Sequence, residues 1–162
     1  MSVFQRTFEV KAPLAEVAAF HDDARSLAAI TPPPVRVKIV RFDAPVRAGS
    51  KVIFKLMLGP LGVTWDGEID QYEAQQFFRD IMHRGPFGKW QHTHSFTATA
   101  GGTKVGDLVV YEPPFGVWGK LLDPILVRPS LKYLFFYRAR LTRRLLEKKT
   151  AKQSAKPAAR GW

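Results

Sequence analysis

The stretch GPFGKWQHTHSF, residues 85–96, is the most informative part of the chain. A Gly-Pro turn stands in front of a run in which Trp90, His92, His94 and Phe96 alternate with small or polar residues. Because successive side chains of a strand point to opposite faces of a sheet, this alternation predicts a face with two imidazoles between two aromatic rings. A purely structural strand would carry Val, Ile or Leu there, so this face is a candidate for ligand binding or catalysis.

Runs of strand character also lie on both sides of this stretch, and short turns rich in Gly and Pro separate many of them. Short loops of this kind join antiparallel neighbours. The strands expected from the pattern span residues 4–10, 35–42, 50–58, 63–72, 76–84, 90–99 and 103–111. Two short helices are expected between the first two strands, because Pro13 suits a first helical turn and Asp22-Asp23 can cap a second helix.

A long helix is expected over about residues 130–149, with Pro129 in its first turn. Arg138 falls in a gap of its apolar stripe, which consists of Leu131, Leu134, Phe135, Leu141 and Leu145. The order of elements predicts an α+β protein in which a curved antiparallel sheet of about seven strands wraps around this helix. We expect one domain over residues 1–150 and a basic, disordered tail over residues 151–162.

The charge of the chain is concentrated at its C-terminal end. Of the formal net charge of +11, residues 128–162 supply nearly all, with eleven Lys and Arg residues and one acid, Glu147. Such a basic end makes an anionic membrane surface a candidate partner. Nucleic acid is not expected as a partner, because no known nucleic-acid-binding motif is present. The absence of cysteine excludes disulfides, and with no secretory signal pattern we expect a cytoplasmic location.

Several short motifs together resemble those of one known superfamily. They are Phe78-x-Asp80, Gly85-Pro86-Phe87, Trp90-x-His92-x-His94-x-Phe96, Gly102-Thr103, Asp107, Tyr111 and Pro113-x-x-Gly116. Over residues 2–149 the chain resembles the START-like, helix-grip superfamily, also called SRPBCC, of ligand-binding and polyketide cyclase/dehydrase domains, and within it a bacterial subgroup of uncharacterised proteins. The resemblance implies an internal hydrophobic pocket whose ligand varies widely. It implies no shared set of catalytic residues, so the catalytic residues stay unknown.

Aromatic residues spread over many elements are typical of an apolar cavity, although an ordinary core has the same pattern. Trp65 lies on the apolar side of a strictly alternating strand, which predicts that it lines the pocket. Arg79 could pair with a ligand carboxylate. The candidate ligand-binding residues are Phe54, Trp65, Arg79, His83, Trp90, His92, His94, Tyr111 and Trp118.

His92 and His94 have two further interpretations. Residues i and i+2 of a strand face the same way, so with a third ligand they could hold zinc. Asp80, His83 and Asp107 are available as that ligand, but Asp80 and His83 have opposite parity, so at most one of them shares the histidine face. The favoured interpretation is hydrogen bonding that orders the sheet, so we expect no metal and no cofactor.

We therefore expect the protein to bind or transport a small hydrophobic ligand, such as a lipid or a polyketide-like or isoprenoid-like molecule. Two alternatives remain. The first is an enzyme of the polyketide cyclase/dehydratase type that uses the same cavity. The second is a peripheral adaptor that binds anionic membrane or nucleic acid through the basic end. The sequence leaves the oligomeric state open.

Overall fold

Seven antiparallel strands form one sheet in a computed structural model that describes residues 1–154. The strands follow the order β1-β7-β6-β5-β4-β3-β2 across the sheet. Their bounds are β1 Ser2–Val10, β2 Arg36–Phe42, β3 Lys51–Leu58, β4 Leu61–Glu73, β5 Phe77–Arg84, β6 Lys89–Thr99 and β7 Gly102–Glu112. All seven strands were expected from the sequence, and no end differs from the expected one by more than two residues.

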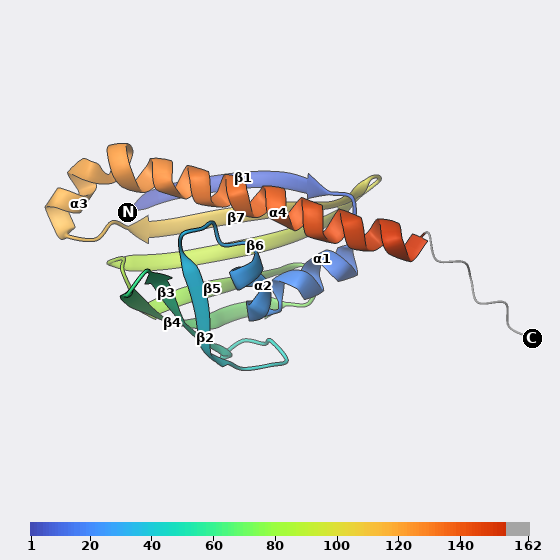
Figure 1. Cartoon of the computed structure of the whole chain (residues 1–162), viewed down its shortest axis with the longest axis horizontal. Helices are drawn as coiled ribbons and strands as arrows, with labels where there is room; N and C mark the ends of the chain where they lie inside the picture. Colours follow the sequence, from blue (N-terminus) through green and yellow to red (C-terminus); the bar gives the residue numbers. More distant parts are fainter. Residues whose placement is uncertain (155–162) are drawn as a thin grey trace, which may run out of the picture.

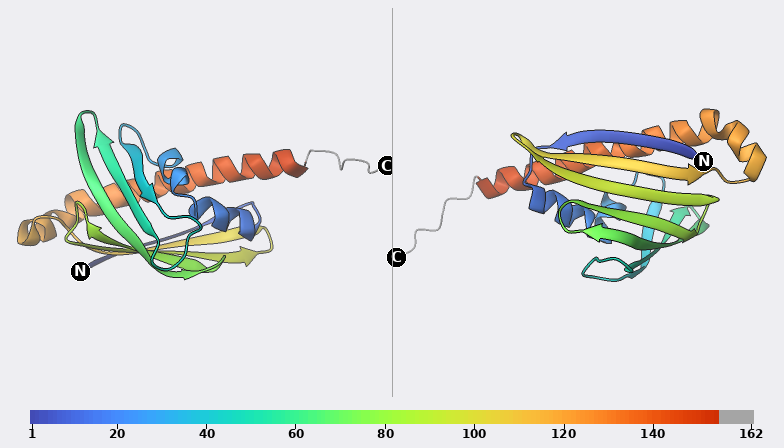
Figure 2. Two further views of the ribbon diagram at one scale, coloured as in Figure 1. Left: turned by 90° about the horizontal axis from the view of Figure 1, so that it is seen from below. Right: turned by 180° about the vertical axis from the view of Figure 1, so that it is seen from behind.

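The sheet is strongly curved, and the strands β2 to β4 rise away from the plane of β1, β7 and β6 (Figure 2). Register shifts occur between Ile39 and Arg41, between Asp66 and Gly67, and between Ile69 and Gln71. Bulges of this kind bend a strand and increase its local twist. Two of the three register shifts lie where β4 pairs with β5. The sheet therefore bends near its middle, toward its concave face.

Two short helices, α1 (Leu14–His21) and α2 (Ala24–Ala29), follow β1 as expected. Asp23 caps α2, because its side chain accepts a hydrogen bond from the backbone N–H of Arg25 at 2.9 Å. A long helix, α4 (Arg128–Ser154), runs across the sheet, and α3 (Gly116–Leu122) projects at the far end of the molecule (Figure 1). No helix within residues 1–154 has both the length and the apolar character that crossing a bilayer demands.

The buried face of α4 differs from the expected stripe in its C-terminal half. Leu141 is half-buried and Leu145 is 43% exposed, whereas Ala139, Thr142 and Leu146 are buried. The small residues Ala139 and Thr142 let the helix lie close to the sheet. An apolar stripe that is defined by large apolar residues alone does not include them. The helix also continues through Ser154, past the expected start of the tail. The rest of the expected tail lies outside the described residues.

The core is divided into two apolar clusters along α4. One lies where α1 packs and includes Phe78, Phe96, Val105 and Leu146. The other lies toward the start of α4 and includes Trp65, Trp90, Tyr111 and Phe135. His92 contacts the ring of Phe135 in the second cluster, and His94 stacks on Phe78 in the first. The two histidines therefore lie at the junction between the clusters.

Candidate ligand cavity

An internal cavity with a volume of about 380 Å³ lies between the sheet and the helices. Aromatic side chains from neighbouring strands form one wall. The ring centroids of Phe54 and Trp65 are 5.6 Å apart in a stacked arrangement, and those of Trp65 and Trp90 are 5.3 Å apart, edge to face. Leu27 and Ile30 from the α2 region and Leu134 from α4 complete much of the apolar lining. The cavity therefore suits an apolar ligand of small size.

Polar side chains from three adjacent strands meet on the floor of this cavity. Asp80 of β5 is paired with His92 of β6 across the sheet, and His94 of β6 is paired with Asp107 of β7. Directly paired residues of antiparallel strands share a face, so all four side chains point toward α4. All four line the cavity.

The strongest polar contact on the floor joins His92 to Asp107. Nε2 of His92 is 2.9 Å from Oδ1 of Asp107, and both side chains are buried. Burial acts to raise the pKa of Asp107, but the neighbouring His92 and His94 outweigh it and hold this pKa below its usual range. An ionised carboxylate only accepts hydrogen bonds, so the Nε2–H of His92 is the donor.

Asp80 is the second carboxylate of the floor. Its Oδ2 is 3.5 Å from Nδ1 of His92 and 3.8 Å from Nε2 of His94. Burial raises the pKa of Asp80 to about 6, although the charges of His94 and Arg138 oppose this rise. Burial also lowers the pKa of both histidines. The floor is thus a set of neutral imidazoles between two carboxylates.

Two further polar residues line the cavity from the helices. His21 of α1 donates from Nδ1 to the carbonyl oxygen of Val17 at 2.8 Å, and burial, with a contribution from His94, lowers its pKa to about 4. Arg138 of α4 makes no ion pair with any acid of residues 1–154, and its Nε is buried without a hydrogen-bond partner. Its guanidinium is 5.6 Å from the ring centroid of Phe135. Arg138 is therefore a cation that faces an apolar cavity.

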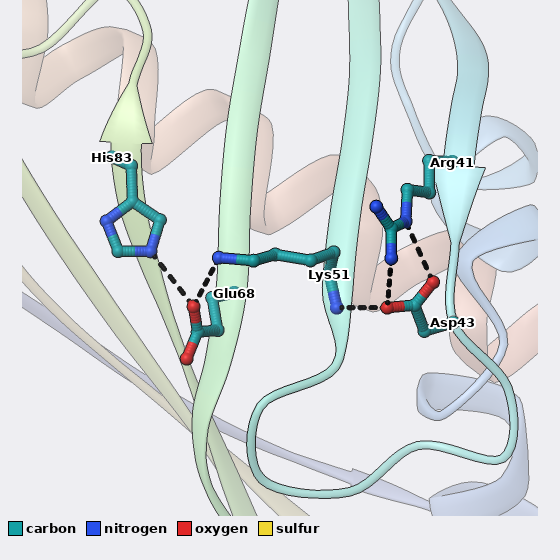
Figure 3. Close-up of polar contacts among 5 residues, drawn as sticks. All are labelled: Arg41, Asp43, Lys51, Glu68 and His83. Atoms are coloured by element: carbon teal, nitrogen blue, oxygen red, sulfur yellow. Dashed lines mark hydrogen bonds and ion pairs between the residues drawn. The ribbon is translucent and has the colours of Figure 1, made fainter.

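Five of the nine candidate residues line the cavity: Phe54, Trp65, Trp90, His92 and His94. Arg79 and His83 lie on the outer face of the sheet, because β5 directs Phe78 and Asp80 inward and its odd-numbered residues outward. Arg79 Nε donates to Asp70 at 2.9 Å. His83 contacts Glu68 at 3.2 Å within a row of charged residues that crosses to Arg41 (Figure 3). Both residues, named as candidates for ligand contact, therefore lie outside the cavity.

Tyr111 and Trp118 also lie away from the cavity lining. Tyr111 has the expected inward orientation, but its hydroxyl donates to Asp123 at 2.7 Å and holds the π-helical turn η1 (Asp123–Val127) against the end of the sheet. Trp118 lies on α3 and is 73% exposed. Both were predicted to line the pocket because they are aromatic. Aromatic character alone does not distinguish a residue that lines a cavity from one that lies elsewhere in the fold.

Sequence reasoning missed two polar residues of the cavity. Arg138 was counted with the basic C-terminal end, although its position in the gap of the apolar stripe indicated that it faces the sheet. His21 of α1 was not among the candidate residues, although the structure places it on the cavity. Asp80 and Asp107 were named as partners of the histidines, and the structure brings both to the floor of the cavity.

A curved antiparallel sheet closed over an internal cavity by a long C-terminal helix is the helix-grip fold, as the resemblance implied. No family model matches the sequence, and no curated protein matches it. Solved structures match over nearly the whole chain. Protein CV1439 from Chromobacterium violaceum has a TM-score of 0.72 and 17% identity, covering 91% of this chain and 99% of that one.

Two further matches have informative names. The di-domain ARO/CYC StfQ from the steffimycin biosynthetic pathway has a TM-score of 0.72 and 13% identity, covering 92% of this chain and 51% of StfQ. Ara h 8.0201, a Bet v 1-like protein, has a TM-score of 0.63 and 13% identity, covering 91% of this chain and 98% of that one. Both have helix-grip SRPBCC folds. At these identities the likeness concerns the fold alone.

Proposed function

We propose that the protein binds a small hydrophobic ligand with a polar group in its internal cavity. The observation that carries this proposal is the cavity itself, about 380 Å³ in volume, with an aromatic wall and a polar floor. Apolar contacts with Trp65 and Trp90 would supply most of the affinity, at roughly 25 cal/mol per Å² of buried apolar surface before the costs of association. Arg138 and His94 would orient the polar group. A lipid or a polyketide-like or isoprenoid-like molecule has this combination.

The test is native mass spectrometry of freshly purified protein, followed by organic extraction and identification of the released molecule. We expect an added mass that disappears on extraction. Delipidated protein should then bind the neutral apolar dye N-phenyl-1-naphthylamine at one site, and the extracted molecule should displace it. A protein that carries no added mass and also fails to bind the dye would contradict the proposal.

Catalysis in the same cavity is an alternative, and the pair formed by His92 and Asp107 favours it. A histidine held by a buried carboxylate can act as a general base when a reacting atom lies within hydrogen-bond reach. His94, which opens toward the cavity beside this pair, is the residue best placed to contact the ligand. The fold likeness to StfQ makes ring closure or loss of water the reaction to test. A His94→Gln variant that keeps ligand affinity but loses turnover would support catalysis, whereas equal turnover would exclude this role.

A second candidate function is docking to an anionic membrane, and the surface of α3 and η1 favours it. Large apolar side chains here are more than half exposed: Phe115, Val117, Trp118, Leu121, Ile125 and Leu126. Lys120 and Lys132 supply positive charge around them, while the acid of this segment, Asp123, is buried against Tyr111 and Ser2 and pairs with Arg128 at 3.8 Å. Exposed aromatic and aliphatic groups with basic neighbours are typical of surfaces that enter the headgroup region of a bilayer.

Cosedimentation with vesicles tests this docking. We expect binding to vesicles of mixed phosphatidylserine and phosphatidylcholine, weaker binding to pure phosphatidylcholine, and loss of binding in a Trp118→Ser/Leu121→Ser variant. Val40→Ser is the matched control, because Val40 is 56% exposed on β2, away from α3. Equal binding by both variants would contradict the assignment. Concentration-dependent dimers that the α3 variant abolishes, without vesicle binding, would show instead that a second copy covers this surface.

A further inference from the structure

Three potential metal ligands converge on the floor of the cavity. Asp80, His92 and His94 each offer one donor atom, and these atoms all lie within 4.8 Å of one another. Nδ1 of His92 is 3.5 Å and Nε2 of His94 is 3.8 Å from Oδ2 of Asp80. Both distances are long for hydrogen bonds. They are close to the separation of about 3.3–3.6 Å between two ligands of one tetrahedral ion, given metal–ligand bonds of about 2.0–2.2 Å.

Asp107 lies on the other side of both imidazole rings. Its Oδ1 is 2.9 Å from Nε2 of His92 and 3.3 Å from Nδ1 of His94, which are the ring nitrogens that do not face Asp80. The hydrogen bond to Asp107 holds the proton of His92 on Nε2, whereas Nδ1 of His94 lies near the same carboxylate without a hydrogen bond. Nδ1 of His92, which faces Asp80, is then left with its lone pair. Metal-binding histidines are oriented in this way by an outer carboxylate or carbonyl group.

The surroundings suit an ion with open coordination positions. Three protein ligands leave room for one or more further ligands, and the site opens into the cavity. Asp80 and Asp107 offset the charge of a divalent ion. Arg138 also lines the cavity and adds one positive charge. An anionic group of a ligand would balance that charge.

We propose that Asp80, His92 and His94 bind one divalent transition metal ion, with Asp107 as the residue that orients His92. Imidazole and carboxylate ligands suit zinc, iron(II), cobalt(II) or manganese(II), and the geometry favours these over calcium or magnesium. This inference departs from the expectation of no metal. The sequence did not reveal that Asp80, rather than His83, shares the histidine face, nor that Asp107 contacts both rings. The inference also does not depend on the proposed apolar ligand.

The test is a metal titration of chelator-treated protein that carries no polyhistidine tag. Isothermal titration with zinc should show one site, and cobalt(II) should give a visible absorption band that zinc removes. Asp80→Asn and His94→Gln should weaken binding by at least 100-fold, and Asp107→Asn by about 10- to 100-fold. His83→Gln is the matched control, because His83 beside Glu68 on the outer face is the alternative site for an adventitious ion.

One measurement does not depend on whether the variants fold. On addition of zinc to wild-type protein, the imidazole nitrogen resonances of His92 and His94 should shift, while those of His83 should not. Shifts confined to His83, or equal losses of affinity in His83→Gln and His94→Gln, would overturn the proposal. So would the absence of one-to-one binding with zinc, cobalt(II), iron(II) and manganese(II).

Discussion

His92 Nε2 lies 2.9 Å from Oδ1 of Asp107, and this contact between two buried side chains ties β6 to β7 on the floor of the cavity. The imidazole and the ring of Phe135 on α4 pack edge to face, with ring centroids 5.1 Å apart. The polar pair is therefore enclosed by the sheet on one side and by the helix on the other. A buried charge in such a place depends on its partner, because water does not replace it.

Removal of the imidazole should therefore destabilise the fold. We expect His92→Phe, which keeps a ring of similar size, to lower the free energy of unfolding by about 3 kcal/mol, because Asp107 loses its best hydrogen-bond donor while it stays buried. Urea denaturation in the presence of a chelator measures this change. In the double variant His92→Phe/Asp107→Leu the buried charge is gone, so the loss should be smaller than the sum of the single losses. Strictly additive losses would show that the two residues are not coupled.

The turn between β6 and β7 offers a second test of the fold. Gly102 has a φ of +147°, and a Cβ added there would lie 2.2 Å from the carbonyl oxygen of Val10. Gly102→Ala should therefore cost about 2 kcal/mol or more, because backbone atoms of the neighbouring segment must move. Gly101→Ala is the control, since an added Cβ there meets no atom within 4 Å. Thermal denaturation of the two variants should separate them clearly, and similar melting temperatures would contradict the geometry.

The fold could be predicted well because its signals are local. Strand character can be read segment by segment, and most turns between the strands carry Gly or Pro, as at Gly101-Gly102. The alternation of β6 put Trp90, His92 and His94 on one face, and the structure turns that face toward the cavity. The Asp23 cap of α2 also followed from residue type and position.

The site was harder to predict because it depends on relations between distant elements. The pairing of β5 with β6 decides that Asp80 joins the histidines and His83 does not, and no single strand carries that information. Which face of α4 is buried depends on Ala139 and Thr142. Their small size lets the helix approach the sheet, and this advantage cannot be seen from the helix sequence alone. As a result Arg138, a cationic residue inside the cavity, was assigned to the surface.

Two arginines with opposite placements give a prediction on ligand binding. Arg138→Gln should weaken binding of the anionic dye 1-anilinonaphthalene-8-sulfonate about tenfold, because a charge-assisted hydrogen bond is lost. Binding of the neutral dye N-phenyl-1-naphthylamine should change little. Arg79→Gln should leave both affinities unchanged and lower the free energy of unfolding by less than about 1 kcal/mol, since its ion pair with Asp70 is partly exposed. Fluorescence titration measures all four affinities, and a larger effect from Arg79 would contradict the placement of both residues.

The cavity can be filled from α4 without disturbing the outer face of the helix. Leu134 is half-buried and lines the cavity, whereas Leu145 is 43% exposed on the same helix. In Leu134→Trp the added ring should occupy the space beside Trp65 and Trp90, so the affinity for N-phenyl-1-naphthylamine should fall at least about tenfold. Stability should change by less than about 1 kcal/mol, because the larger side chain enters empty space rather than packed core. Leu145→Trp adds the same ring on the exposed side and should leave the dye affinity unchanged. A folded Leu134→Trp variant that binds the dye as tightly as wild type would mean that the dye binds elsewhere, and the cavity would lose its role as the ligand site.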